Sequence, residues 1–176
     1  MFARIPHGSR SPRGALAVLL ALASLLLVSC GGGSSSGSAL PAGSTAFSGT
    51  TIEGASFDNA EAAKGPEVLW FWAPWCTVCR AESGDVADVA ASFKGKVTFV
   101  GVPGRGKVPE MRQFVSETGT GGFQHVSDAS GDLWKQFGVA SQPSFVFVDA
   151  AGHATRVTGS LDAEQLTKRV SALRAG

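Results

Sequence analysis

Two cysteines separated by two residues, Cys76 and Cys79, are the side chains whose types and spacing are best suited to chemistry. Cysteines three positions apart at the start of a helix can close a small disulfide, and the first lies where unpaired backbone N–H groups and the helix dipole stabilise a thiolate. The apolar stretch 68–72 just before them is typical of a central strand covered on both faces. A strand that delivers a cysteine pair onto a helix N-terminus predicts thiol–disulfide redox chemistry.

A metal or haem site is the main alternative for a cysteine pair of this spacing. Structural zinc needs four ligands, and the sequence offers neither a second cysteine pair nor a histidine pair. Covalent haem attachment needs His directly after the second cysteine, and that residue is Arg80. We therefore expect no metal and no separate cofactor, with the redox group being the Cys76–Cys79 disulfide itself.

The segment 72–79, Trp-Ala-Pro-Trp-Cys-Thr-Val-Cys, resembles the active-site segment of the thioredoxin superfamily. The likeness is to its extracytoplasmic branch of TlpA- and DsbE-type proteins, and in particular to secreted actinobacterial DsbE-like disulfide oxidoreductases. It continues through 80–82, 99–102 and 142–147 and covers residues 44–176. The resemblance implies an α/β thioredoxin fold, with a mixed central sheet flanked by helices and an N-terminal β-hairpin extension.

The resemblance also implies roles for five residues. Cys76 would be the catalytic residue that attacks or is attacked, and Cys79 would resolve the mixed disulfide. Pro143 matches the family's cis-proline, which lies against the cysteine pair, and a fold can hold a cis X-Pro bond at a cost of roughly 0.5–1 kcal/mol. The backbone of Gln142 would pair with an extended substrate segment. Trp75 would shape the exposed lip around the reactive sulfur.

Three positions near the cysteines need separate interpretation. Trp70 stands where thioredoxin has a buried, proton-relaying Asp, and we expect Trp70 to be a core residue. Glu82 lies one turn beyond Cys79 and could interact with it, but an ordinary solvated helix residue is the expectation. Gly84 replaces a proline that kinks the helix in the related family, and glycine permits a bend without enforcing one.

The first 29 residues have the pattern of a secretory signal peptide. Three arginines and no acidic residue precede an apolar run, 15–28, that is shorter than the roughly 20 residues needed to span a bilayer. We therefore expect export, with residues 1–29 removed. Removal would leave 12 basic and 14 acidic residues, so no basic patch would attract nucleic acid.

Cys30 follows 27–29, Leu-Val-Ser, which resembles the lipobox of bacterial lipoproteins, so we expect Cys30 to be lipidated. The alternative is a stray cysteine at an ordinary cleavage site, but an unpaired exposed thiol would be a liability in an oxidising compartment. Residues 30–43, rich in Gly and Ser, predict a flexible tether, and the domain would begin at residue 44. The expected location is extracytoplasmic and lipid-anchored to the cell membrane, with secretion as the alternative.

The segment 101–107 matches the pattern of a phosphate-binding loop, Gly, four residues, then Gly-Lys. Such a loop needs Ser or Thr after the lysine to hold Mg²⁺, and Val108 has no oxygen to offer. We interpret the segment as a glycine-rich loop that leads into a helix with Pro109 in its first turn.

Periodicity and turn residues predict an opening hairpin with strands in 45–47 and 50–52, then a short helix near 59–63. The expected order after that is strand, helix, strand, helix, short strand, helix, two antiparallel strands and a final helix capped by Asp162. The expected strands are 68–72, 97–100, 123–126, 144–148 and 153–158.

The expected function is that of an extracytoplasmic thiol–disulfide oxidoreductase that acts, as a monomer, on cysteines of exported proteins and exchanges electrons with a membrane redox partner. The likeness to DsbE-like oxidases and the presence of Trp70 favour oxidation. A TlpA-type reductase supporting cytochrome maturation is the alternative. Two other classes of function are possible from the fold alone. The intact cysteine pair argues against a non-catalytic thioredoxin-fold binding module, and no peroxidase-type motif supports a peroxide-reducing enzyme.

Overall fold

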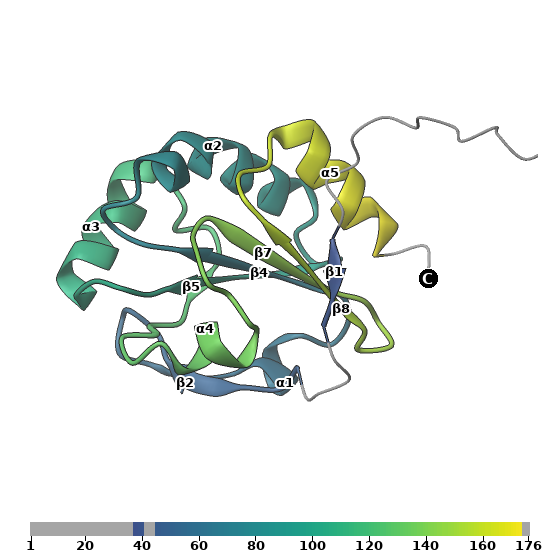
Figure 1. Ribbon diagram of the computed structural model, residues 1–176, viewed down its shortest axis with the longest axis horizontal. Helices are drawn as coiled ribbons and strands as arrows, with labels where there is room; N and C mark the ends of the chain where they lie inside the picture. Colours follow the sequence, from purple (N-terminus) through teal and green to yellow (C-terminus); the bar gives the residue numbers. More distant parts are fainter. Residues whose placement is uncertain (1–36, 41–44, 174–176) are drawn as a thin grey trace, which may run out of the picture. The chain divides into compact units, whose positions relative to one another are not determined.

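A mixed sheet of six strands is the centre of the structure, a computed structural model that describes residues 37–40 and 45–173 (Figure 1). Its helices are α1 (Asn59–Ala62), α2 (Thr77–Ser92), α3 (Val108–Thr118), α4 (Asp132–Gln136) and α5 (Ala163–Ala172). The strands are β1 (Ser38–Ala39), β2 (Ser48–Thr50), β3 (Ser56–Asp58), β4 (Glu67–Trp72), β5 (Thr98–Pro103), β6 (Gln124–His125), β7 (Ser144–Val148) and β8 (Ala154–Thr158). The order in the main sheet is β1-β8-β7-β4-β5-β6, and β2 and β3 form a separate hairpin. The predicted order of elements from β4 onward is confirmed.

Strand β4 lies in the middle of the sheet, parallel to β5 and antiparallel to β7. All six of its residues are buried, as the apolar run predicts. Because side chains alternate across a strand, Val68, Trp70 and Trp72 belong to the core on the side of α2, α3 and α5, whereas Leu69 and Phe71 belong to the core on the side of α4 and the hairpin. The expectation that Trp70 is a core residue is confirmed.

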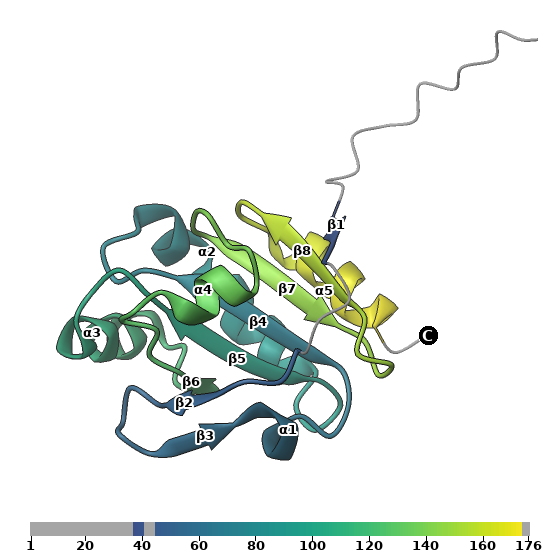
Figure 2. The same ribbon diagram turned by 60° about the horizontal axis from the view of Figure 1, so that its bottom comes forward.

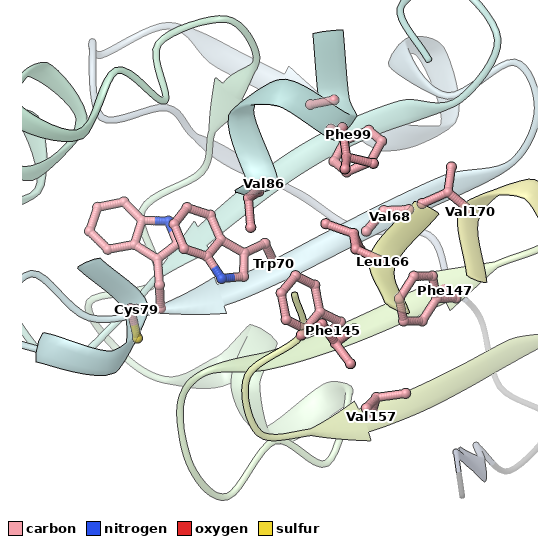
Figure 3. Packing of buried hydrophobic residues seen from close by; sticks show 14 of the residues in the cluster. Val68, Trp70, Cys79, Val86, Phe99, Phe145, Phe147, Val157, Leu166 and Val170 are labelled. Atoms are coloured by element: carbon pink, nitrogen blue, oxygen red, sulfur yellow. The ribbon is translucent and has the colours of Figure 1, made fainter. Parts of the chain in front are cut away.

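The cysteines lie at one end of the first of these cores. Figure 3 shows the cluster extending from Leu166 and Val170 of α5, past Trp70, to Cys79 at the start of α2. Helix α2 continues through Gly84, where an added Cβ would meet no atom within 4 Å. The helix is therefore unbroken where the related family has proline.

The opening hairpin is present, but its strands differ from the prediction. The turn falls within 51–55, where the Thr51 N–H donates to the Ala55 carbonyl at 2.8 Å and Gly54 adopts a φ of 93°. The segment 45–47 pairs with no strand, because the side-chain amide of Asn59 bonds to the Thr45 carbonyl and to the Phe47 N–H. A side chain from the following helix thus replaces the predicted strand pairing.

Part of the expected tether belongs to the sheet. Ser38 and Ala39 form β1, which pairs antiparallel with Arg156 and Thr155 of β8, as Figure 2 shows. The prediction that 30–43 is wholly flexible is therefore wrong at these residues, because β8 would otherwise present an unpaired edge that a short strand can cover. The signal peptide, Cys30 and the remainder of the tether lie outside the described residues.

The final helix is bounded as its sequence predicts. Asp162 accepts a hydrogen bond from the Gln165 N–H at 2.8 Å, and the Gln165 side chain accepts one from the Asp162 N–H at 3.3 Å. Leu161 and Leu166 are both buried across this cap. Within residues 37–40 and 45–173, no helix combines the length and the apolar character that crossing a membrane requires.

Candidate active site

The cysteine pair lies just beyond the carboxyl end of β4, where α2 begins. Cys76 is the N-cap of α2, and Cys76 and Cys79 form a disulfide with their Cα atoms 5.3 Å apart. The Cys79 N–H donates to the Cys76 Sγ at 3.0 Å. A backbone amide of the first helical turn is therefore aimed at the first sulfur, which is the arrangement that stabilises negative charge there.

The two cysteines differ in their access to solvent. Cys76 is 6% exposed, whereas Cys79 is completely buried. Two large apolar side chains are exposed within the described part of the chain: Trp75, directly before Cys76, and Val78, between the two cysteines. Cys76 is therefore the less enclosed of the two cysteines, next to the apolar surface of Trp75 and Val78.

The bond between Gln142 and Pro143 is cis, as the resemblance implies. Pro143 immediately precedes β7, whose first residue, Ser144, pairs with Phe71 near the end of β4. This register places the cis-proline loop at the same end of the sheet as the cysteines. The backbone N–H and carbonyl of Gln142 make no hydrogen bond within the part of the chain that the structure describes.

Glu82 is buried, at 4% exposed, so the expectation of a solvated residue is wrong. The Trp70 indole N–H donates to its Oε1 at 2.8 Å, and the Leu161 N–H donates to its Oε2 at 3.2 Å. Glu82 lies four residues before Val86 on the buried face of α2, and this periodicity is the sequence signal that could have identified it. A buried indole N–H needs an acceptor, which the carboxylate supplies.

Burial raises the pKa of the Glu82 carboxyl above its usual range. Hydrogen bonds from Ser160, Trp70 and Leu161 oppose the rise, and the nearby charge of Asp85 adds to it. A carboxyl group whose pKa is raised in this way, one turn from Cys79, holds a proton more readily than an exposed glutamate does.

Comparison with protein families matches residues 42–158 to the AhpC/TSA family. The chain belongs to the AhpC/TSA family. It is 42% identical to the soluble secreted antigen MPT53 of Mycobacterium tuberculosis over 130 residues, which is 72% of this chain and 74% of that protein. It is 28% identical over 124 residues to HelX, a thiol:disulfide interchange protein of Rhodobacter capsulatus, covering 69% of each.

The chain is also similar to a solved structure. It is that of a secreted Mycobacterium tuberculosis disulfide oxidoreductase homologous to E. coli DsbE, with 41% identity and a TM-score of 0.67 over 72% of this chain and 95% of that one. Together with the cysteine pair, these similarities confirm the expected DsbE-like resemblance and thioredoxin-type fold. The protein is a thiol–disulfide oxidoreductase.

Trp75, the exposed side chain beside Cys76, has a hydrogen-bond partner that no sequence pattern indicates. The Trp75 indole N–H donates to the carbonyl of Arg105 at 2.7 Å, and the Arg105 guanidinium donates to the Gln142 side chain at 3.3 Å. Arg105 belongs to the glycine-rich segment 101–107, which leads into α3 as expected.

Among the described residues, no group of three or more His, Cys, Asp or Glu side chains could hold a metal ion.

Proposed function

We propose that the protein exchanges disulfides with exported, cysteine-containing proteins through a mixed disulfide on Cys76. The observation that supports this most strongly is the difference between the two cysteines: Cys76 keeps 6% of its surface exposed at the helix N-terminus, whereas Cys79, in the first turn of α2, is completely buried. A substrate sulfur can therefore bond only to Cys76, while Cys79 is placed to break that bond from within. The disulfide itself serves as the redox group, with no separate cofactor.

In the oxidising direction, a substrate thiolate attacks the Cys76 Sγ, forms a mixed disulfide and releases Cys79 as a thiolate. A second substrate thiolate then attacks the substrate sulfur of the mixed disulfide and expels Cys76 as a thiolate. Two electrons pass from the substrate to the cysteine pair, which a disulfide-containing or quinone-linked membrane partner must then reoxidise. The reducing direction is the reverse of these steps.

The substrate segment is held beside Cys76 by the cis-proline loop. The backbone N–H and carbonyl of Gln142, which have no partner in the described part of the chain, can pair with an extended segment as an added strand would. Pro143 lacks an N–H and fixes the direction of this loop. Trp75 and Val78 give the segment an apolar surface beside the reactive sulfur.

Glu82 exchanges the proton of Cys79 in this proposal. Both side chains are buried on one face of α2, three residues apart, so neither has bulk water with which to exchange a proton. When Cys79 is released from the disulfide as a thiolate, a neutral Glu82 can supply the proton, directly or through one water.

Replacing Glu82 with Gln is expected to lower the pH midpoint of Cys79 alkylation by about one unit in the reduced protein, because a neutral amide removes a like charge beside the thiolate. The rate of Cys79 alkylation in a Cys76→Ser background, measured from pH 5 to 10, provides the test. Asp88→Asn, an exposed residue of the same helix, is the control. Equal midpoints in the Glu82→Gln and Asp88→Asn variants would show that Glu82 does not act on Cys79.

Oxidation of exported proteins is the direction that we propose. The support is the likeness to DsbE-like oxidoreductases and the presence of Trp70 where thioredoxin has a proton-relaying Asp. Thr77 and Val78, between the cysteines, supply no cation that would stabilise a thiolate strongly. We therefore expect a reduction potential between the roughly −270 mV of thioredoxin and the roughly −120 mV of DsbA.

Equilibration of the protein with glutathione buffers tests this direction, because each 30 mV corresponds to roughly 1.4 kcal/mol for a two-electron couple. The oxidised protein should also accelerate the refolding of a reduced, disulfide-containing substrate. A potential near that of thioredoxin, together with failure in the refolding assay, would make a TlpA-type reductase the better assignment.

We further propose that Cys30 is lipidated and anchors the domain at the outer face of the cell membrane, where its redox partner lies. The lipobox-like segment 27–29 supports the anchor. A Cys30→Ala variant is expected to leave the membrane fraction or to remain unprocessed, with the fraction determined by immunoblotting and the N-terminus by mass spectrometry. An unmodified mature N-terminus on the native protein would instead indicate secretion without an anchor.

A further inference from the structure

We propose that Arg105 is a positioning residue that fixes the distance between Trp75, beside the cysteine pair, and the cis-proline loop 140–143. Through this distance, Arg105 determines the rate at which the protein reacts with a polypeptide disulfide, but not the rate with a small disulfide. The inference rests on the proposed pairing of substrate backbone with Gln142. It gives a role to the glycine-rich segment 101–107, which the sequence indicates only as a loop.

Arg105 contacts three separate segments around the site. Its carbonyl accepts the hydrogen bond from the Trp75 indole N–H at 2.7 Å. Its guanidinium donates to the Ala140 carbonyl at 2.8 Å and to the Gln142 Oε1 at 3.3 Å. The same guanidinium lies over the ring of Trp134 in α4, 4.7 Å from its centroid. Arg105 therefore joins Trp75 beside the cysteines, the cis-proline loop and helix α4.

The two glycines beside Arg105 explain how the loop comes close enough to do this. A Cβ at Gly104 would lie 2.7 Å from the Trp134 ring, and a Cβ at Gly106 would overlap the Pro74 ring of the cysteine segment. Arg105 itself has a φ of 54°, which makes it the non-glycine residue with left-handed backbone among the described residues. Close packing against Trp134 and Pro74, rather than phosphate binding, accounts for Gly104 and Gly106.

The hydrogen bonds of Arg105 link the cysteine segment to the cis-proline loop. Within the described part of the chain, no hydrogen bond joins the segment 73–78 directly to the segment 140–143. A hollow of about 540 Å³ beside α4 is bordered by Gly138, Val139 and Ala140. Arg105 also borders this hollow, and without its side chain the loop would lose its hydrogen bonds at the Ala140 carbonyl and the Gln142 side chain.

The consequence differs between substrates. A polypeptide must place its sulfur over Cys76 while its backbone pairs with Gln142, so its reaction depends on the distance between the two. A small aromatic disulfide needs only access to the Cys76 sulfur. Arginine is suited to this task because its rigid, planar fork donates to two acceptors at once, which a lysine ammonium at the same position cannot match in geometry.

The test compares two single-turnover reactions of the reduced full chain: reduction of insulin disulfides and reduction of 5,5′-dithiobis(2-nitrobenzoate). Arg105→Gly removes the side chain and suits the left-handed backbone. The expected result is a fall of about tenfold in the rate constant with insulin, with the aromatic disulfide rate and the reduction potential within about twofold of wild type. Lys107→Ala, which removes one positive charge from the same loop, should leave both reactions unchanged.

Arg105→Lys should resemble Arg105→Gly with insulin, and it decides the question if the glycine variant does not fold. Equal insulin rates in wild type and in the Arg105 variants, or equal losses with both substrates, would overturn the inference. Failure of the wild-type chain to form any mixed disulfide with insulin would instead refute the proposed function, and the role of Arg105 with it. A tenfold loss in Lys107→Ala would assign the effect to charge and not to positioning.

Discussion

Replacing Cys79 with Ser is expected to give a protein that captures its substrates in a lasting mixed disulfide and reduces turnover by at least about 10³-fold, on the scale seen when covalent catalysis loses an essential group. The Cys76 thiolate at the start of α2 can still attack a substrate disulfide, bond to one substrate sulfur and expel the other as a thiolate. The mixed disulfide then persists because position 79 no longer carries a thiol that could attack the Cys76 sulfur and release the substrate. Non-reducing electrophoresis and mass spectrometry of the captured proteins would measure the adduct.

Cys76→Ser is the matched variant for this experiment. It should lose activity to the same extent but capture nothing, because Cys79 is completely buried. In the reduced wild type, alkylation at mildly acidic pH should label Cys76 first, since the N-terminal amides of α2 stabilise its thiolate. Adducts on Cys79, or preferential labelling of Cys79, would reverse the roles given to the two cysteines.

Replacing Glu67 with Gln is expected to stabilise the protein by about 2 kcal/mol at pH 8 and to leave its stability nearly unchanged at pH 4.5. Glu67 is 2% exposed at the start of β4. Its Oε2 accepts a hydrogen bond from the Asn59 side chain at 3.2 Å, but its Oε1 has no hydrogen-bond partner among the described residues. Burial raises the pKa of the Glu67 carboxyl from 4.5 to about 7, although the bond from Asn59 opposes the rise.

The sign of this pH dependence follows from the raised pKa. Between pH 4.5 and about 7, the folded protein keeps a proton on Glu67 that the unfolded chain has lost, so the free energy of unfolding falls as the pH rises. Above that range the whole cost applies, about 3 kcal/mol for this shift. Glutamine resembles the protonated carboxyl and avoids most of that cost, although its buried amide N–H still lacks an acceptor.

Urea denaturation at several pH values from 4.5 to 8 would measure the effect. The exposed Glu53, changed to Gln, is the control and should follow the pH dependence of the wild type. If the curves of wild type and Glu67→Gln run parallel across this range, the Glu67 carboxyl is already ionised in the folded protein and the assignment fails.

The sequence by itself determined the features that depend on neighbouring residues. An apolar run followed by two cysteines three apart predicts a central strand, a helix start and a disulfide, and β4, α2 and the Cys76–Cys79 bond are all present. The cap of α5 at Asp162 is likewise local, because its two hydrogen bonds join residues three apart. The position of Pro143 could be inferred only by resemblance to a family that has a cis-proline there.

Only the tertiary structure decided which polar side chains surround the cysteines. Glu82 has the spacing of a buried residue on α2, yet its burial as a carboxylate depends on the Leu161 N–H, 79 residues away in the sequence. Arg105 meets Gln142 across 37 residues and Trp75 across 30. Local periodicity carries no information about such distant partners, and the energy of a buried polar group depends on whether they are present.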